Sequence, residues 1–102
     1  MTFHGIDFSG TDIAAFCRRN RIRRLSLFGS ILRADFREGS DVDILVEFEP
    51  GCVPGLLRMA GLELELSEVL GRKVDLRTAA ELNRHSREEV LNQAVPQYDA
   101  TG

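Results

Sequence analysis

Nothing in the sequence of 102 residues indicates attachment to a membrane or export. No apolar run reaches the roughly 18–20 residues that a membrane-spanning helix needs. The first residues also lack the basic start and the apolar stretch of a secretory signal peptide. We therefore expect a protein that stays in the cytoplasm and does not associate with membranes.

Cysteine is scarce as well. The chain has only Cys17 and Cys52, and their separation fits no pattern of metal ligands. In a reducing compartment we expect two such cysteines to be free thiols rather than a disulfide. Cys17 lies on the apolar face of a predicted helix, so its side chain is expected in the core.

The chain has no excess of positive charge, because its formal net charge at pH 7 is −3. Tight, nonspecific binding to long nucleic acids needs clustered positive charge, so we do not expect it here. Five arginines nevertheless crowd one short segment: Arg18, Arg19, Arg21, Arg23 and Arg24. This cluster is either a solvated helix end and strand edge, as is typical of charge runs, or a surface that binds an anion or a partner.

Length and composition limit the chain to one domain, because so short a chain buries too little surface for two independent cores. Hydrophobic residues make up 43% and charged residues 28%, which is typical of a globular domain rather than a disordered tail. No internal repeat, low-complexity tract or long linker divides the chain. We expect a single domain over residues 1–102, with its core between about residues 11 and 95.

Apolar periodicity predicts alternating helices and strands. Strand patterns cover three segments: residues 21–28, 41–48 and 73–76. Helical patterns cover residues 11–20 behind a cap at Thr11 or Ser9, a short helix from Ser30, residues 56–70, and a region from the capping box Thr78-Ala-Ala-Glu81 to about Ala94. The last region is expected to break near His85-Ser86 and to stop at Pro96. This order predicts an α/β (α+β) domain with a small mixed sheet of about three or four strands, packed by helices.

The helix predicted over residues 56–70 has a clear apolar stripe: Met59, Leu62, Leu66, Val69 and Leu70. Leu64 falls outside this stripe, which marks it as a contact for a partner protein. Gly71 follows the last apolar residue and is expected to end the helix.

The strand predicted over residues 41–48 begins with two aspartates. Its apolar residues fall on one face, so Asp41 and Asp43 project together from the other face. Neighbouring carboxylates repel each other unless a cation lies between them, and Mg²⁺ is a hard cation that takes carboxylate and phosphate oxygens. Asp75, in a later predicted strand, is the candidate for a third carboxylate. We therefore expect Asp41, Asp43 and Asp75 to be catalytic residues that bind two metal ions.

The second candidate feature is Gly29-Ser30, where the strand over residues 21–28 ends. Glycine lets the backbone approach a phosphate closely, and a following helix start offers N–H groups to an anion. The Ser30 hydroxyl can donate to a phosphate oxygen, and Arg33 can pair with the same phosphates. Two metals about 3.5–4 Å apart activate an attacking oxygen and stabilise a leaving one. Together these features predict a site for nucleotidyl transfer.

Each of these residues also has a purely structural interpretation. Asp41 and Asp43 could be a solvated strand start after a turn, and Asp75 an exposed strand residue. Arg33 could be a plain surface arginine. A D-x-D or a Gly-Ser pair is common by chance, so the order of the elements carries the functional interpretation: strand, Gly-Ser, short helix, turn, D-x-D strand, and a later strand with the third aspartate.

Residues 29–48, GSILRADFREGSDVDILVEF, resemble the signature of the minimal nucleotidyltransferases of the DNA polymerase beta superfamily. Residues 70–76, LGRKVDL, are similar to that family's third-carboxylate segment. The resemblance covers about residues 22–95 and departs from the family at Ala34, where glycine is usual. It implies the nucleotidyltransferase fold and assigns a role to each site residue: Gly29 and Ser30 bind the triphosphate of ATP, Asp41 and Asp43 bind Mg²⁺, and Asp75 activates the acceptor.

Members of this family often pair with a HEPN-domain protein as a toxin–antitoxin system, in which the nucleotidyltransferase adenylylates a tyrosine of the toxin. The resemblance thus implies Mg²⁺-dependent transfer of AMP from ATP to a HEPN toxin. Two alternatives stay open: a non-catalytic antitoxin that neutralises its partner by complex formation, and transfer to a small molecule such as an aminoglycoside. Enzymes that modify small molecules generally carry an added helical domain for the acceptor, and 102 residues leave no room for one. The sequence leaves base preference and homo-oligomerisation open.

Overall fold

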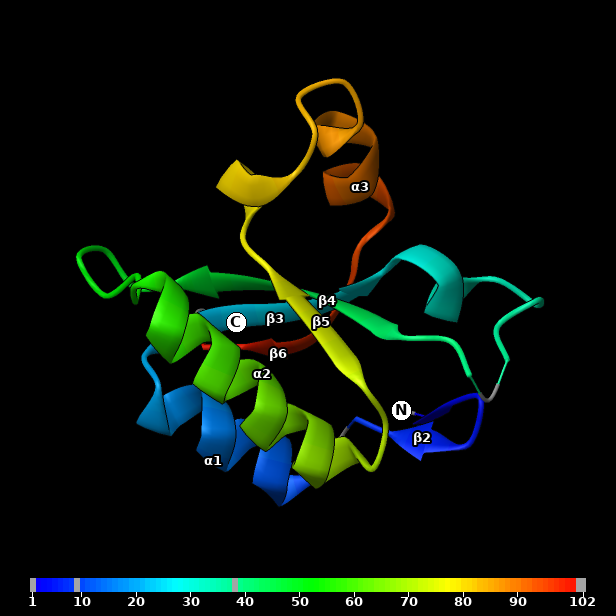
Figure 1. The fold of residues 1–102 in the computed structure, drawn as a ribbon, viewed down its shortest axis with the longest axis horizontal. Helices are drawn as coiled ribbons and strands as arrows, with labels where there is room; N and C mark the ends of the chain where they lie inside the picture. The colour runs from blue at the N-terminus through cyan, green and yellow to red at the C-terminus, as the bar shows by residue number, and fades with distance from the viewer. Residues whose placement is uncertain (1, 9, 38, 101–102) are drawn as a thin grey trace.

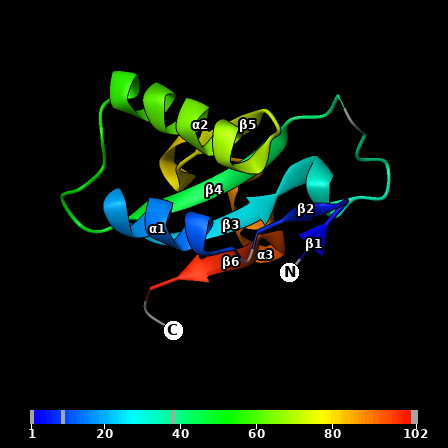
Figure 2. The same cartoon turned by 90° about the horizontal axis from the view of Figure 1, so that it is seen from below.

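A four-stranded mixed β-sheet with two long helices against one face forms the centre of the fold (Figure 1, Figure 2). The structure, a computed structural model, describes residues 2–8, 10–37 and 39–100. Its main elements are α1 (Thr11–Arg19), β3 (Ile22–Phe28), β4 (Val42–Phe48), α2 (Leu56–Leu70), β5 (Val74–Arg77), α3 (Arg87–Gln93) and β6 (Val95–Asp99). The strand order is β5-β4-β3-β6, with β3 antiparallel to β4 and β6, and β4 parallel to β5. The predicted α/β class with a small mixed sheet is confirmed.

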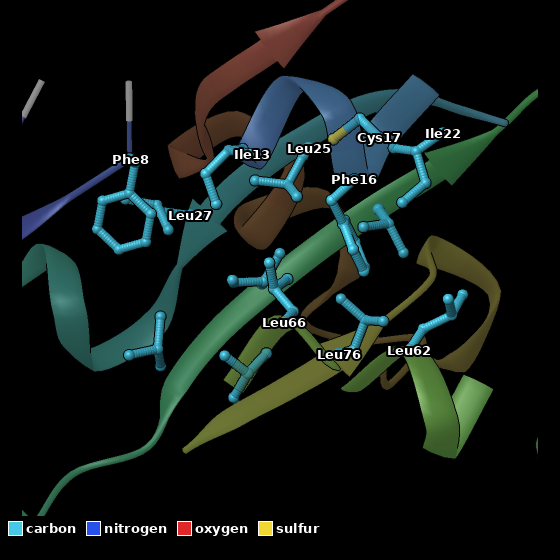
Figure 3. Packing of buried hydrophobic residues seen from close by; sticks show 14 of the residues in the cluster. Phe8, Ile13, Phe16, Cys17, Ile22, Leu25, Leu27, Leu62, Leu66 and Leu76 are labelled. Atoms are coloured by element: carbon cyan, nitrogen blue, oxygen red, sulfur yellow. The ribbon is translucent and has the colours of Figure 1, made fainter. Parts of the chain in front are cut away.

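The interior strand β4 alternates between the two faces of the sheet, as predicted. Val42, Ile44 and Val46 are almost completely buried and join the same cluster as Leu25 and Leu27, two residues of β3. Figure 3 shows the side chains that α1, α2 and β5 add to this cluster: Ile13, Phe16, Leu62, Leu66 and Leu76. The core therefore lies between the sheet and the two helices, and the opposite face of β4 carries Asp43, Leu45 and Glu47.

The first helix, α1, confirms the predicted span but not the predicted cap. Gly10 is the N-cap, and Thr11 is the first helical residue and makes no side-chain cap; Ser9 lies outside the described residues. Cys17 is fully buried, as expected, and this burial raises the pKa of its thiol to about 12. Both cysteines are free thiols.

The second helix, α2, begins and ends where the apolar pattern predicted. Gly71 ends it with a left-handed φ of 70°. Leu62 and Leu66 are buried, but Val69 is 39% exposed, so its place in the buried stripe was predicted wrongly. Val69 lies about 60° around the helix from Leu66 and therefore falls at the margin of the buried face. With 15 residues α2 is the longest helix, and no described helix is long and apolar enough to cross a membrane.

The C-terminal region differs most from the sequence expectation. The capping box at Thr78 and Glu81 is present, but it opens only a short 3₁₀ turn (η2, Ala79–Glu81). The helical region breaks before α3, near His85-Ser86 as expected. The chain then forms β6, which was not predicted. Pro96 is tolerated there because β6 is an edge strand with an irregular register against β3.

Two smaller features complete the description. A hairpin of β1 (Thr2–Phe3) and β2 (Ile6–Asp7) precedes α1 and was not predicted. The arginine cluster of residues 18–24 is exposed, and two of its members form ion pairs at the surface: Arg19 with Glu65, and Arg24 with Glu47 and Asp99. The arrangement supports the solvated interpretation of the cluster.

Candidate active site

Three of the predicted site elements meet at one end of the sheet. β3 ends at Phe28, which lies opposite Asp43 on β4, so Gly29-Ser30 follows directly beside that aspartate. On the other side of β4, Asp43 is in register with Asp75 on the parallel strand β5. Asp41 lies one residue before β4 begins. The register alone therefore gathers Gly29, Ser30 and the three aspartates from segments far apart in the sequence.

Position 29 requires glycine for two reasons: its left-handed backbone conformation and the closeness of the Asp43 side chain. Its φ is +74°, in the left-handed region that favours glycine. A Cβ at this position would overlap a carboxylate oxygen of Asp43 and lie 3.1 Å from Asp43 Cγ. The sequence argument for glycine, close approach to a phosphate, did not include this contact with a neighbouring aspartate.

Ser30 contacts both aspartates of the D-x-D pair. Its backbone N–H donates a hydrogen bond to the Asp43 carboxylate, and its hydroxyl donates to the Asp41 backbone carbonyl over 3.5 Å. Ser30 is the second residue of the short 3₁₀ helix η1 (Gly29–Leu32), which confirms the short helix predicted here. Arg33 follows η1 and forms an ion pair with Asp35 over 3.6 Å.

The Asp43 carboxyl has a pKa above its usual range. Burial is the main cause, and the negative charge of Asp75 adds to it, followed by a smaller effect of Asp41. The Ser30 N–H and the Arg33 charge act in the opposite direction without cancelling the effect. Three carboxylates thus interact electrostatically, and their ionised forms are held together at a cost that a cation would remove.

Two cations that sequence reasoning missed lie beside the outer aspartates. Arg77 Nε lies 3.1 Å from Asp75 Oδ1, and Arg77 Nη2 donates to Asp75 Oδ2 over 3.4 Å. Lys73 Nζ lies 3.9 Å from Asp41 Oδ2. Lys73, Asp75 and Arg77 are two residues apart along one segment and so share one face. This alternation of charges is visible in the sequence, but its meaning depends on the pairing of β5 with β4.

The donor set suits Mg²⁺, although its side chains are not yet arranged around one point. Asp43 and Asp75 lie on adjacent strands, which are about 4.8 Å apart, and Mg²⁺ is commonly held by one or two carboxylates together with substrate phosphates. Within residues 2–8, 10–37 and 39–100, no three acidic, histidine or cysteine side chains are close enough to share a metal ion. The two outer carboxylates instead face Arg77 and Lys73. The chemistry of the three carboxylates and the register of β4 with β5 fit the ion.

A groove of about 460 Å³ lies beside the second half of β4, and none of the three site aspartates lines it. Leu45, two residues after Asp43 and in register with Arg77, lines the groove. Its other walls come from the loop after β4, η2 and α3, with side chains that include Val53, Ala79 and Leu91. Val53 is 66% and Leu91 47% exposed. Sequence reasoning did not find this groove, because its walls come from four separate segments.

Comparison with known proteins places this geometry in a family. Residues 13–96 match the nucleotidyltransferase domain family. The chain is similar to a Thermococcus cleftensis protein named "Protein adenylyltransferase MntA", with 40% identity over 74 residues, which is 72% of this chain and 73% of the relative.

Solved structures with the same fold agree with this result. One, described as "Structure of putative minimal nucleotidyltransferase", has 40% sequence identity and a TM-score of 0.69, and the match covers 84% of this chain and 86% of that chain. Another is the complex of tri-AMPylated Shewanella oneidensis HEPN toxin with MNT antitoxin, at 22% identity and a TM-score of 0.64 over 89% of this chain and 70% of that chain. At this identity the second similarity shows the fold alone.

Proposed function

The chain belongs to the nucleotidyltransferase domain family, and on that basis we propose that it transfers AMP from ATP to a tyrosine of a HEPN-domain toxin, whose antitoxin it is. The observation that carries the proposal is the meeting of Gly29-Ser30, Asp43 and Asp75 at one end of the sheet. The names of similar proteins support it, because one relative is a protein adenylyltransferase and one structure of the same fold joins an MNT antitoxin to an AMPylated HEPN toxin.

In the proposed reaction, the tyrosine oxygen attacks the α-phosphorus of ATP. A bond forms between these two atoms, the bond from the α-phosphorus to the bridging oxygen of the β-phosphate breaks, and pyrophosphate leaves with the electron pair. The tyrosine proton passes to a carboxylate oxygen of Asp75, which is in register with Asp43. Arg77 pairs with both Asp75 oxygens, and the incoming proton competes with this positive charge for the carboxylate as long as the pair persists.

The remaining residues hold the substrate and the carboxylates in place. Gly29 leaves space for the Asp43 carboxylate, and the Ser30 N–H orients it. In this proposal the Ser30 hydroxyl and Arg33 contact the triphosphate, and Arg33 exchanges its present ion pair with Asp35 for a phosphate. Asp41, Asp43 and Asp75 are the residues that would hold Mg²⁺, which when bound neutralises the charge of the carboxylates and phosphates.

Exposed apolar side chains support a protein as the acceptor. Val53 and Leu91 border the groove next to the second half of β4, and Leu56 and Leu57, which follow Val53 closely in the chain, are 86% and 90% exposed. Exposed apolar groups of this kind are typical of protein-binding surfaces. We propose that the tyrosine-bearing segment of the toxin packs against this groove, so that its hydroxyl reaches Asp75.

The proposed substrate also agrees with a place of action in the cytoplasm, where ATP is available and where thiols such as those of Cys17 and Cys52 stay reduced.

Label transfer tests the proposal directly. The protein is incubated with α-labelled ATP and Mg²⁺, with and without a HEPN-domain protein from the same genome, and Asp41→Ala/Asp43→Ala serves as the inactive control. Label on the partner that depends on both aspartates is the expected result. A partner that is neutralised equally well by the aspartate variant, with no label, would instead identify a binding antitoxin that acts by complex formation.

A further inference from the structure

Lys73 and Arg77 form ion pairs with two of the three site carboxylates, Asp41 and Asp75, and both cationic side chains are exposed. The Arg77 contact is two-pronged, with Nε at 3.1 Å from one Asp75 oxygen and Nη2 at 3.4 Å from the other. The Lys73 contact with Asp41 is looser, at 3.9 Å. Asp43 between them has no ion pair among the residues that the structure describes, and its charge is offset only by the Ser30 N–H and the more distant Arg33.

We propose that Lys73 and Arg77 are exchangeable counter-ions that hold Asp41 and Asp75 until ATP arrives and then pair with its phosphates. The proposal rests on the function proposed above and assigns a positioning role to two residues outside the predicted site. A guanidinium binds a phosphate through the same paired geometry that it now uses for Asp75. Lys73 is 80% exposed at its side chain and so is free to move.

The exchange accounts for the present arrangement of the site. Three carboxylates lie at one end of the sheet, yet no three acidic, histidine or cysteine side chains of the described residues are close enough to share a metal ion. An oxygen that pairs with Arg77 is less available to a metal ion, and a cation beside Asp75 repels a divalent ion. When the triphosphate draws both cations away, the carboxylates become free as the phosphates supply further oxygens. Metal and nucleotide then bind cooperatively, and each raises the affinity for the other by the same factor.

Metal affinity without nucleotide separates this role from a merely structural one. Arg77→Met is expected to bind Mn²⁺, measured by electron paramagnetic resonance, about threefold to tenfold more tightly than the wild type, because the variant loses both the competing contact and the repulsion. Lys73→Met is expected to act in the same direction but more weakly. Arg77→Lys, which keeps the charge without the two-pronged contact, is expected to lie between Arg77→Met and the wild type.

The matched control is Arg24→Met. Arg24 lies on β3, pairs with Glu47 and Asp99 rather than with a site aspartate, and its loss changes the net charge by the same amount. Circular dichroism checks that each variant is folded. The titration is then repeated with a non-hydrolysable ATP analogue. The nucleotide is expected to tighten Mn²⁺ binding in the wild type and to do so by a smaller factor in Arg77→Met.

The outcomes distinguish this inference from the proposed function. If Arg77→Met and Lys73→Met leave Mn²⁺ affinity unchanged or weaken it while the wild type transfers label to its partner, the counter-ion role is overturned and the function stands. If the wild type binds no Mn²⁺ with or without nucleotide, both are overturned. If both variants bind Mn²⁺ more tightly than Arg24→Met does, the exchange is supported whatever the identity of the acceptor.

Discussion

The substitution Gly29→Ala tests whether the glycine is needed by the neighbouring aspartate or only by the backbone. Gly71 provides the control, because its φ of +70° is close to the +74° of Gly29, yet a Cβ at Gly71 would meet nothing within 4 Å. At Gly29 the same Cβ would overlap the Asp43 carboxylate. The two substitutions remove one glycine each and differ mainly in this contact.

The expected magnitudes follow from that difference. A left-handed φ costs alanine about 1–2 kcal/mol relative to glycine, and this cost applies to both variants. In Gly29→Ala the Asp43 side chain must also rotate, which breaks its hydrogen bond with the Ser30 N–H. Such a bond to a charged group contributes about 1.5–3 kcal/mol, of which we expect about half at this partly exposed carboxylate. Gly29→Ala should therefore lose about 0.7–1.5 kcal/mol more stability than Gly71→Ala.

Thermal unfolding followed by circular dichroism measures the difference, which corresponds to a gap in Tm of roughly 3–12 °C for a domain of this size. Combining Gly29→Ala with Asp43→Ala isolates the contact with the carboxylate, because only the 3.2 Å approach to the Cβ of residue 43 then remains. The cost of the glycine substitution should fall toward that of Gly71→Ala. Equal destabilisation by Gly29→Ala and Gly71→Ala, or an unchanged cost in the Asp43→Ala background, would refute the reasoning.

Three further predictions concern charge, docking and thiol reactivity. Asp43→Asn should raise the unfolding free energy at neutral pH. The reason is the raised pKa of Asp43, because wild-type stability then falls as pH rises from the ordinary carboxyl pKa through the raised one. Denaturant titrations should show the gain in stability disappear below this pH window, and a constant gain at all pH values would contradict the prediction. Leu91→Asp should weaken binding of the HEPN partner about tenfold or more. Asn92→Asp, an exposed control on the same helix, should leave the affinity unchanged. Calorimetry measures both affinities, and equal effects of the two substitutions would contradict the docking of the partner in the groove. Native protein should be alkylated at the partly exposed Cys52 and not at Cys17, because burial raises the pKa of the Cys17 thiol to about 12. Mass spectrometry locates the label, and rapid labelling of Cys17 would contradict its place in the core.

The elements that the sequence predicted well are those with strong local periodicity. β4 has four apolar residues at alternate positions and α2 has a long stripe that ends in glycine, and both were located within a residue of their observed bounds. The adjacent positions of Gly29, Asp43 and Asp75 were also anticipated, from the order of the motifs along the predicted strands and from the family resemblance.

What the sequence did not reveal depends on contacts between distant segments. β6 is five residues long and contains Pro96, which locally indicates a helix stop, and only pairing with β3 makes it a strand. The roles of Lys73 and Arg77 depend on the parallel register of β5 with β4, which is non-local. The groove has the same origin, since Leu45, Val53 and Leu91 are brought together only by the fold.

The most direct test of the account compares ATP labelled at the α-phosphate with ATP labelled at the γ-phosphate, using the HEPN partner as acceptor. The wild type should label the partner from the α position alone, with release of pyrophosphate, and Asp43→Asn and Asp75→Asn should each abolish labelling while they remain folded. Transfer from the γ position would show phosphoryl rather than nucleotidyl transfer. Full α-labelling by Asp43→Asn or Asp75→Asn would contradict the central claim that these aspartates form the active site.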